Sequence, residues 1–206
     1  MSWPDGRVVK YSIAVDISEL KETQNRLAEA HAQLALKNRE LARLSSTDSL
    51  TGLANRLALD SVLNDETARA ERHARIFSII LGDIDHFKRI NDQHGHAVGD
   101  TALRAVAGVL AGSVRGTDVV GRFGGEEFLV VCPETDAAGA GRLAENLRRA
   151  VAEREFAAGS RLTMSFGVAE SLPGELPSRL VSRADAALYR AKALGRNRVC
   201  QAAGTE

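Results

Sequence analysis

A pair of glycines followed by two carboxylates is the feature that most limits how this 206-residue chain can fold. Gly124 and Gly125 separate two stretches of strand-like sequence, residues 118–123 and 126–132. Because glycine adopts positive φ angles without steric cost, this arrangement predicts a tight hairpin between antiparallel strands. The predicted hairpin therefore excludes a fold built on a purely parallel, doubly wound sheet.

The two residues after the glycines are Glu126 and Glu127, which place two negative charges at the hairpin. A glycine-rich turn lets a ligand approach the backbone closely, and paired carboxylates suit a hard divalent cation held against a phosphate. Similar strings also occur in surface hairpins whose acids are only solvated. This motif alone leaves a metal–phosphate site and a solvated turn as alternatives.

A second acidic cluster lies upstream, where Asp83 and Asp85 follow the apolar stretch 76–81. That stretch reads as a buried strand, and acids at the end of such a strand are common metal ligands. The alternative is that an acid of this cluster caps the next helix.

The next helix is predicted over residues 87–94, because the spacing is helical and Gly95 follows it. Its first backbone N–H groups suit phosphate oxygens, and Lys88 adds a positive charge there.

The rest of the sequence from residue 55 onward alternates between the hydrophobic periodicity of helices and that of strands. Further helices are predicted at residues 55–73, 99–114, 137–156 and 177–194, and further strands at 75–82, 161–169 and near Val199. Together with the hairpin, this pattern predicts an α/β (α+β) fold, a mixed sheet of about five strands with helices on its faces.

The segment 18–44 is predicted to form one long helix, because it contains neither glycine nor proline. Leucines recur in it every seven residues, which favours a parallel two-stranded coiled coil. The leucines are Leu20, Leu27, Leu34 and Leu41; one register adds Thr23, Ala30, Lys37 and Leu44, and the other adds Ile17, Gln24, His31 and Asn38. Neither register makes a strong seam. A single amphipathic helix lying on the domain is the alternative.

Composition excludes several classes of partner. The 27 Lys and Arg residues balance 27 Asp and Glu residues, so no net charge favours nucleic acid or a membrane surface. No apolar run is long enough to span a membrane, and no signal peptide is visible.

Cys132 and Cys200 lie in predicted strands, which indicates buried thiols and a reducing, cytoplasmic setting. The spacing of His86, His94 and His96 fits no usual zinc pattern.

Five sequence blocks resemble, in order and spacing, the GGDEF family of diguanylate cyclases. They are residues 48–56 (DSLTGLANR), 83–92 (DIDHFKRIND), 95–100 (GHAVGD), 124–128 (GGEEF) and 187–197 (ALYRAKALGRN). The resemblance covers about residues 45–201 and implies the ferredoxin-like palm of nucleotide cyclases. The family accepts Asp or Glu at the third hairpin position, which is Glu126 here.

The resemblance implies a reaction in which two GTP molecules condense to cyclic di-GMP and release two pyrophosphates. It implies two Mg²⁺ or Mn²⁺ ions per half-site, with Asp83, the carbonyl of Ile84 and Glu126 as ligands. Glu126 or Glu127 corresponds to the acceptor of the proton of the attacking 3′-hydroxyl, and the sequence does not distinguish between them. Lys88 is implied to act on the phosphates during catalysis.

Further substrate contacts are implied by the same resemblance. Phosphate contacts correspond to Lys88, Lys192 and Arg196, guanine contacts to Asn91 and Asp100, and neighbours of the nucleotide to His86, Phe87 and His96. A carboxylate that accepts from the N1–H and amino groups of guanine rejects adenine, because adenine lacks that donor pair.

A possible regulatory site precedes the hairpin. Arg115 and Asp118 form an R-x-x-D string, and five residues separate Asp118 from Gly124. This spacing resembles the family's inhibitory product site, in which the arginine contacts guanine or phosphate and the aspartate contacts the guanine edge.

The sequence thus predicts three parts. Residues 1–17 resemble the end of a PAS sensor domain, 18–44 form the signalling helix, and 45–206 form the catalytic domain. The two-fold symmetry of the product implies a homodimer in which each domain supplies half of an active site. A catalytically silent module that binds GTP or cyclic di-GMP, or a pure signal relay, would be the alternative.

Overall fold

The computed structural model describes residues 46–73, 75–156 and 161–203, together with scattered positions between 21 and 33. The chain divides into two compact units, residues 1–44 and 45–206, and each is considered by itself. The predicted sensor remnant at 1–17 lies outside the described residues, and so do most positions of the predicted coiled-coil helix 18–44. The described positions within that helix are helical.

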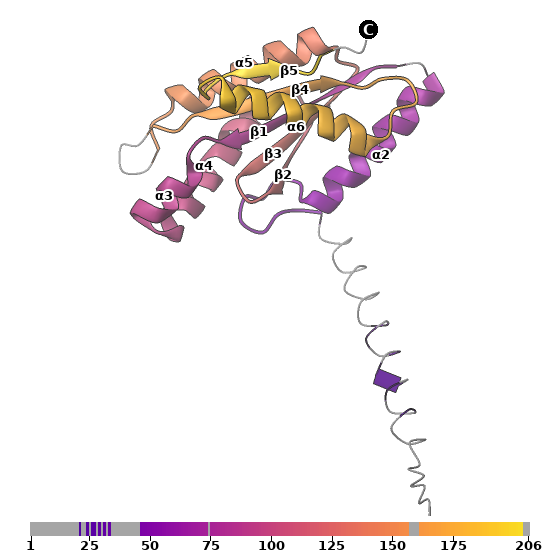
Figure 1. Ribbon diagram of the computed structural model, residues 1–206, viewed down its shortest axis with the longest axis horizontal. Coiled ribbons are helices and arrows are strands. Elements are labelled where there is room, and N and C mark those ends of the chain that lie inside the picture. Colours follow the sequence, from indigo (N-terminus) through magenta and orange to yellow (C-terminus); the bar gives the residue numbers. More distant parts are fainter. Residues whose placement is uncertain are drawn as a thin grey trace, which may run out of the picture. The chain divides into compact units, whose positions relative to one another are not determined.

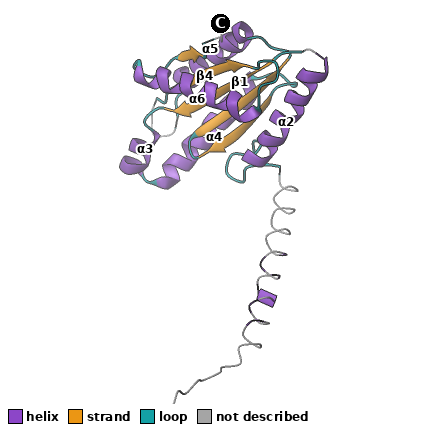
Figure 2. Ribbon diagram, turned by 45° about the vertical axis from the view of Figure 1, so that its right-hand side comes forward, coloured by secondary structure: helices purple, strands orange, loops and turns teal. Residues whose placement is uncertain are grey.

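A mixed five-stranded sheet forms the centre of the unit 45–206 (Figures 1 and 2). The strands are β1 (Phe77–Ile84), β2 (Val119–Gly124), β3 (Glu127–Pro133), β4 (Met164–Glu170) and β5 (Val199–Gln201). Their order in the sheet is β2-β3-β1-β4-β5. β1 pairs antiparallel with both β3 and β4, β2 pairs antiparallel with β3, and the short β5 runs parallel to β4. The predicted mixed sheet is therefore confirmed.

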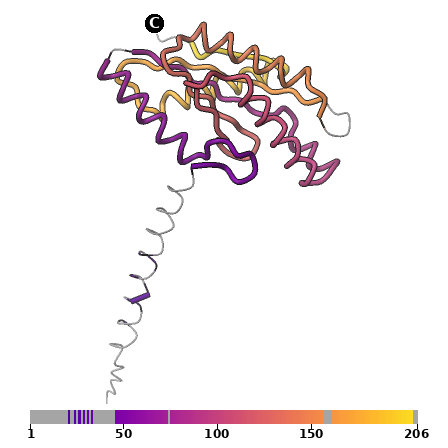
Figure 3. The backbone as a smooth tube through the Cα atoms, turned by 180° about the vertical axis from the view of Figure 1, so that it is seen from behind, coloured from indigo at the N-terminus to yellow at the C-terminus, as the bar shows by residue number. Residues whose placement is uncertain are grey.

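Five helices of the described region flank this sheet. They are α2 (Arg56–His73), α3 (Phe87–His94), α4 (His96–Ser113), α5 (Ala137–Glu153) and α6 (Pro177–Ala193). Helices α2 and α6 pack on one face, and α4 and α5 cover the other (Figures 1 and 3). Alternating β1 side chains divide between the two cores, with Ile79 and Leu81 on the α2–α6 side and Ile80 and Ile84 on the α4–α5 side.

Several element boundaries differ from the sequence prediction. β1 spans 77–84 instead of 75–82, because its antiparallel partners on both sides continue to Asp83 and Ile84. Asp83 therefore lies inside the strand and not beyond it. α4 begins at His96, one turn before the predicted start, since Gly99 is accommodated within the helix. α5 ends at Glu153 and β4 begins at Met164, each about three residues inside the predicted limit.

The hairpin turn is placed one residue later than the glycine pair suggested. Gly124 is the last residue of β2 and pairs with Glu127, so the turn consists of Gly125 and Glu126. Gly125 has a φ of 44°, whereas Gly124 is in a strand. The register shifts between Arg122 and Gly124, which places a bulge next to the turn. Glu126 consequently occupies the turn itself, and Glu127 begins β3.

The prediction for the two thiols is only half right. Cys132 is fully buried in β3, and burial raises the pKa of its thiol to about 12. Cys200 is half-buried in the short strand β5, because this strand lies at the edge of the sheet. Both cysteines are free. Among the described helices, none combines the length and the apolar character needed to cross a membrane.

Candidate active site

Two strands bring the acidic residues together at one end of the sheet. Asp83 on β1 is the register partner of Glu127 on β3, and the backbone N–H of Ile84 donates to the carbonyl of Glu126 at 3.4 Å. Asp83 and Glu127 share the strand face of Leu81 and Leu129, which is covered by α2 and α6. The hairpin and β1 thus gather the three predicted acids, although Asp83 lies 43 or more positions before the two glutamates in sequence.

The environment of these acids opposes their ionisation. Burial raises the pKa of Asp83; a hydrogen bond and the charge of Lys192 oppose the rise, and repulsion from Asp85 adds to it. Burial and then the charge of Asp83 raise the pKa of Glu126 and of Glu127. Burial, with added repulsion between the acids, thus outweighs the stabilisation that Lys192 gives to their charged forms.

The C-terminal end of α6 supplies the positive side of the site. The ammonium of Lys192 lies 2.8 Å from Oδ2 of Asp83, and Arg196 also lowers the pKa of that carboxyl. The phosphate contacts expected of both cations remain a prediction. Lys192 lies in the last turn of α6 as predicted, and Leu194 caps the helix just before Gly195.

The donor set fits a divalent cation in chemistry, although it is not arranged as a finished site. Carboxylate and carbonyl oxygens are the ligands that Mg²⁺ prefers, and a cation would relieve the repulsion that raises the pKa values of Glu126 and Asp83. Within the described part of the chain, no group of three or more His, Cys, Asp or Glu side chains has the geometry of a metal centre. The metal ligands Asp83, Ile84 and Glu126 therefore remain a prediction.

The start of α3 lies directly after β1. Its N-cap residue is His86, which has a φ of 59° and makes no capping hydrogen bond with its side chain. The alternative that an acid of the 83–85 cluster caps this helix is therefore wrong. Lys88 and His86 are exposed, whereas Phe87 is buried in the core under α4. The exposed Lys88 is thus accessible to a phosphate at the start of α3.

The predicted guanine-reading residues lie on two helices that pack closely. Asn91 on α3 contacts α4 at Gly99, where an added Cβ would stand 1.9 Å from the side-chain oxygen of Asn91. Asp100 follows Gly99 and is half-buried, and His96 is exposed in the first turn of α4. Glycine at position 99 is therefore what allows the Asn91 side chain to pack against α4 at the position just before Asp100.

The R-x-x-D string forms a closed turn between α4 and β2. The backbone N–H of Arg115 donates to Oδ2 of Asp118 at 3.0 Å, and the N–H of Asp118 donates to the carbonyl of Arg115 at 3.0 Å. The turn borders a cavity of about 330 Å³ whose lining includes Arg142 and Asn146 of α5. Since β2 runs for six residues from here to the hairpin, this cavity lies about 20 Å along the sheet from Glu126.

Comparison with known proteins agrees with this arrangement. Residues 45–198 match the family model described as diguanylate cyclase, GGDEF domain. The chain belongs to the GGDEF family. The diguanylate cyclase DgcP of Pseudomonas aeruginosa is 44% identical over 156 residues, which are 74% of this chain and 23% of that protein. The response regulator PleD of Caulobacter vibrioides is 43% identical over 162 residues, or 76% of this chain and 36% of PleD. The chain thus spans about a quarter to a third of these relatives.

Solved GGDEF domains share the fold. The GGDEF domain of DgcB from Caulobacter crescentus, solved in complex with c-di-GMP, has a TM-score of 0.74 and 39% identity over 77% of this chain and 96% of that one. The active GGEEF domain of a diguanylate cyclase from Vibrio cholerae has a TM-score of 0.71 and 37% identity, covering 74% of this chain and 99% of that one.

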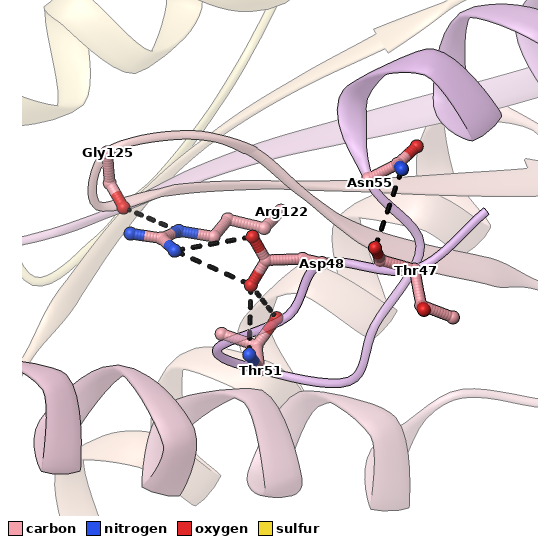
Figure 4. A network of polar contacts seen from close by, with 6 residues as sticks. All are labelled: Thr47, Asp48, Thr51, Asn55, Arg122 and Gly125. Carbon is pink, nitrogen blue, oxygen red and sulfur yellow. Dashed lines mark hydrogen bonds and ion pairs between the residues drawn. The ribbon is translucent and has the colours of Figure 1, made fainter. Parts of the chain in front are cut away.

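The structure of this GGDEF domain also reveals a polar network that sequence reasoning missed (Figure 4). Asp48, in the first motif of the domain, accepts from the N–H of Thr51 at 2.9 Å and from its hydroxyl at 2.7 Å. Arg122 of β2 lies 3.4 Å from both oxygens of Asp48, and its Nε donates to the carbonyl of Gly125 at 2.9 Å. Burial alone would raise the pKa of Asp48, but the bonds from Thr51 and the Arg122 guanidinium lower it overall.

This network connects the start of the domain to the GGEEF hairpin. A neighbouring contact strengthens the link, because the Arg56 guanidinium at the start of α2 lies 3.5 Å from the ring centre of Phe123. The signal in the sequence was an arginine two residues before the glycine pair, but its partner Asp48 is 74 residues away. Only the fold identifies the pair.

Proposed function

We propose that this chain is a diguanylate cyclase that condenses two GTP molecules into cyclic di-GMP with release of two pyrophosphates. The observation that supports it most is the meeting of three elements at one end of the sheet. Buried Asp83 faces the GGEEF hairpin, and Lys192 of α6 contacts the same carboxylate. The reaction needs this combination of anionic and cationic groups around a triphosphate.

The protein's own residues would bind and orient the nucleotide. The first N–H groups of α3, Lys88, Lys192 and Arg196 would hold the phosphate oxygens through charge-assisted hydrogen bonds. Asn91 and Asp100 would donate and accept along the guanine edge, so that ATP leaves the half-buried acid unpaired.

The acidic residues would help to activate the attacking 3′-hydroxyl group. Asp83, the Ile84 carbonyl and Glu126 would hold Mg²⁺ or Mn²⁺, two ions per half-site, which supply neutralising charge and polarise the 3′-hydroxyl. Glu126 or Glu127 would accept the hydroxyl proton. The raised pKa of each carboxyl brings it closer to that of an effective general base at neutral pH.

A complete reaction centre requires two copies of the domain. The product is two-fold symmetric, so two half-sites with one GTP each would face each other across a two-fold axis. A coiled coil formed by residues 18–44 would hold the domains at high effective concentration. Leu27 of the predicted seam is 58% exposed in the single chain, which leaves this leucine available to a partner helix.

The test of the proposed activity is incubation with Mg²⁺ and GTP followed by separation of the nucleotides. Cyclic di-GMP and pyrophosphate should form in a 1:2 ratio, and EDTA should abolish both. Asp100→Ser should relax the preference for GTP over ATP in a competition assay. Bound but unconverted GTP under all metal conditions would favour the silent-module alternative.

We also propose that cyclic di-GMP inhibits the enzyme through the Arg115–Asp118 turn. The closed turn and the adjoining cavity of about 330 Å³ offer a guanidinium and a carboxylate to a ligand that carries both phosphates and guanines. Arg115→Ala should weaken product binding and leave the initial rate nearly unchanged. Equal product sensitivity of variant and wild type would remove the site from the proposal.

A further inference from the structure

Asp85 is a buried carboxylate that the proposed reaction does not use. It is 6% exposed and lies just beyond β1, two residues after Asp83. Its Oδ1 accepts from the Ser165 hydroxyl at 2.7 Å, and its Oδ2 accepts from the Thr163 hydroxyl at 2.7 Å. Oδ2 also accepts from the backbone N–H of Asn197 at 3.0 Å. All three donors are neutral, and they come from two other segments of the chain, residues 163–165 and Asn197.

The segment after α6 needs such an anchor. Arg196 and Asn197 have φ angles of 60° and 45°, in the left-handed region that side-chain-bearing residues avoid. Two left-handed residues in succession persist only where surrounding contacts hold them. The N–H of Arg196 donates to Ala191 at 3.1 Å, and the side-chain oxygen of Asn197 accepts from Arg148 at 2.8 Å. The N–H of Asn197 donates to Asp85.

The geometry points to Asp85 as a positioning residue for Arg196. By fixing the N–H of the next residue, Asp85 holds the left-handed backbone conformation at Arg196, the residue to which the proposed function assigns a phosphate contact. One strand end thus carries two aspartates with different tasks: Asp83 faces Lys192, and Asp85 fixes the loop that carries Arg196. This inference rests on the proposed function, because it assigns Arg196 to a GTP phosphate.

The chemistry of the anchor predicts which substitution is tolerated. A carboxylate only accepts hydrogen bonds, which matches three donors. In Asp85→Asn, the amide NH₂ can face Ser165, whose hydroxyl can rotate to accept, while the remaining oxygen keeps Thr163 and Asn197. Asp85→Ala removes the acceptor and leaves the Asn197 N–H without its partner. The Asp85→Asn variant should therefore keep most of the nucleotide affinity that the Asp85→Ala variant loses.

A double-mutant cycle tests the inference by binding instead of turnover. The probe is 3′-deoxy-GTP with Mg²⁺, because it lacks the attacking hydroxyl and cannot react. Arg196→Ala and Asp85→Ala should each raise its dissociation constant by about 10-fold or more, the scale of one charged hydrogen bond. The double variant should bind no worse than Arg196→Ala within about twofold, since both changes remove one interaction. Asp85→Asn should stay within about threefold of wild type.

Controls and a nucleotide-free readout keep the test decisive. Asp65→Ala, at an exposed position of α2, should leave binding unchanged. Thermal unfolding checks that each variant is folded; if Asp85→Ala is not, Asp85→Leu takes its place in the cycle. Hydrogen exchange of the Asn197 amide should accelerate at least about 10-fold when Asp85 is replaced by alanine or, if necessary, by leucine. This readout separates failure of the anchor from failure of GTP binding by the wild type. The inference would be overturned if the affinity loss of the double variant equalled the product of the two single losses. It would also be overturned if hydrogen exchange at the Asn197 amide did not change.

Discussion

At the scale of single residues, the three acids of the candidate site lower the stability of the fold. Asp83, Glu126 and Glu127 repel one another, and burial raises the pKa of each. A raised carboxyl pKa in the folded state means that ionisation opposes folding. We interpret the cluster as charge held in place for a cation and a phosphate.

Neutralising one of these acids should lower activity and raise stability. Glu126→Gln or Asp83→Asn should reduce the rate of cyclic di-GMP formation at least about 100-fold, the scale of one lost charge-stabilising group. Near-normal turnover in either variant would remove that residue from the reaction centre.

The stability effect of Glu126→Gln depends on pH in a defined direction. In the wild type the folded pKa lies above the unfolded value near 4.5, so the free energy of unfolding falls as pH rises through that window. Without divalent metal, Glu126→Gln should therefore unfold at a higher temperature than wild type at pH 7. The difference should vanish below about pH 4, where the carboxyl is protonated in both states. Calorimetry across this range measures it, and a variant less stable at pH 7 would contradict the assignment of repulsion.

At the scale of elements, the packing of α3 on α4 positions the residues that are proposed to read guanine. Gly99 touches Asn91, whereas Gly108 on the same helix has no neighbour within 4 Å of an added Cβ. The two glycines form a matched pair for substitution.

Gly99→Ala should displace Asn91 and raise the Michaelis constant for GTP about 10-fold or more, because the new methyl group overlaps a base-reading side chain. Gly108→Ala should leave this constant unchanged and add about 0.5–1 kcal/mol to the free energy of unfolding, the helix preference for alanine. Steady-state kinetics and chemical denaturation measure both. Similar kinetics for the two variants would show that Asn91 does not contact the substrate.

The hairpin depends on a second inter-element contact, the Asp48–Arg122–Gly125 network (Figure 4). Arg122→Met keeps most of the side chain's apolar volume and removes its bonds to Asp48 and the Gly125 carbonyl. The free energy of unfolding should fall by about 1–2 kcal/mol. The cyclase rate should drop several-fold with little change in the Michaelis constant, because the turn carries Glu126 and not the phosphate or base contacts.

Arg104→Met provides the control for this change, since Arg104 is an exposed arginine of α4. Arg104→Met should change neither the free energy of unfolding nor the cyclase rate. An Arg122→Met enzyme with wild-type rate and lower stability would show that the network supports the fold without positioning the turn.

At the scale of the whole molecule, activity should depend on how two copies are held together. The repeat of leucines in residues 18–44 and the two imperfect registers predict a dimer whose register is weakly fixed. This part of the proposal concerns residues that lie mostly outside the described ones.

Deletions within that helix test the register. Removing four residues turns its exit by about 400°, or roughly 40° net, and moves the leucine seam out of phase. Removing seven residues preserves the phase. The four-residue deletion should change the cyclase rate far more than the seven-residue deletion, while sedimentation shows both to be dimers. Equal rates in two intact dimers would mean that the helix is a passive tether.

The sequence by itself determined the local features of this protein. Glycines and caps end helices, apolar runs define strands, and the Gly-Gly-Glu-Glu hairpin requires antiparallel pairing, so the mixed sheet and its elements were predicted within a few residues. The family's sequence blocks also contain the acids and the lysine that the fold brings together at the candidate site. These features depend on neighbouring residues, whose spacing is visible in the chain.

Only the tertiary structure decided how distant residues meet. It paired Asp83 with Glu127, joined Asp48 to Arg122, and turned Asp85 from a possible helix cap into an anchor for the Asn197 backbone 112 residues away. It also moved the hairpin turn onto Gly125 and Glu126, because a bulge shifts the strand register. Register and long-range hydrogen bonds follow from the packing of the whole sheet, in which each strand's position depends on all its neighbours. Local periodicity carries no information about them.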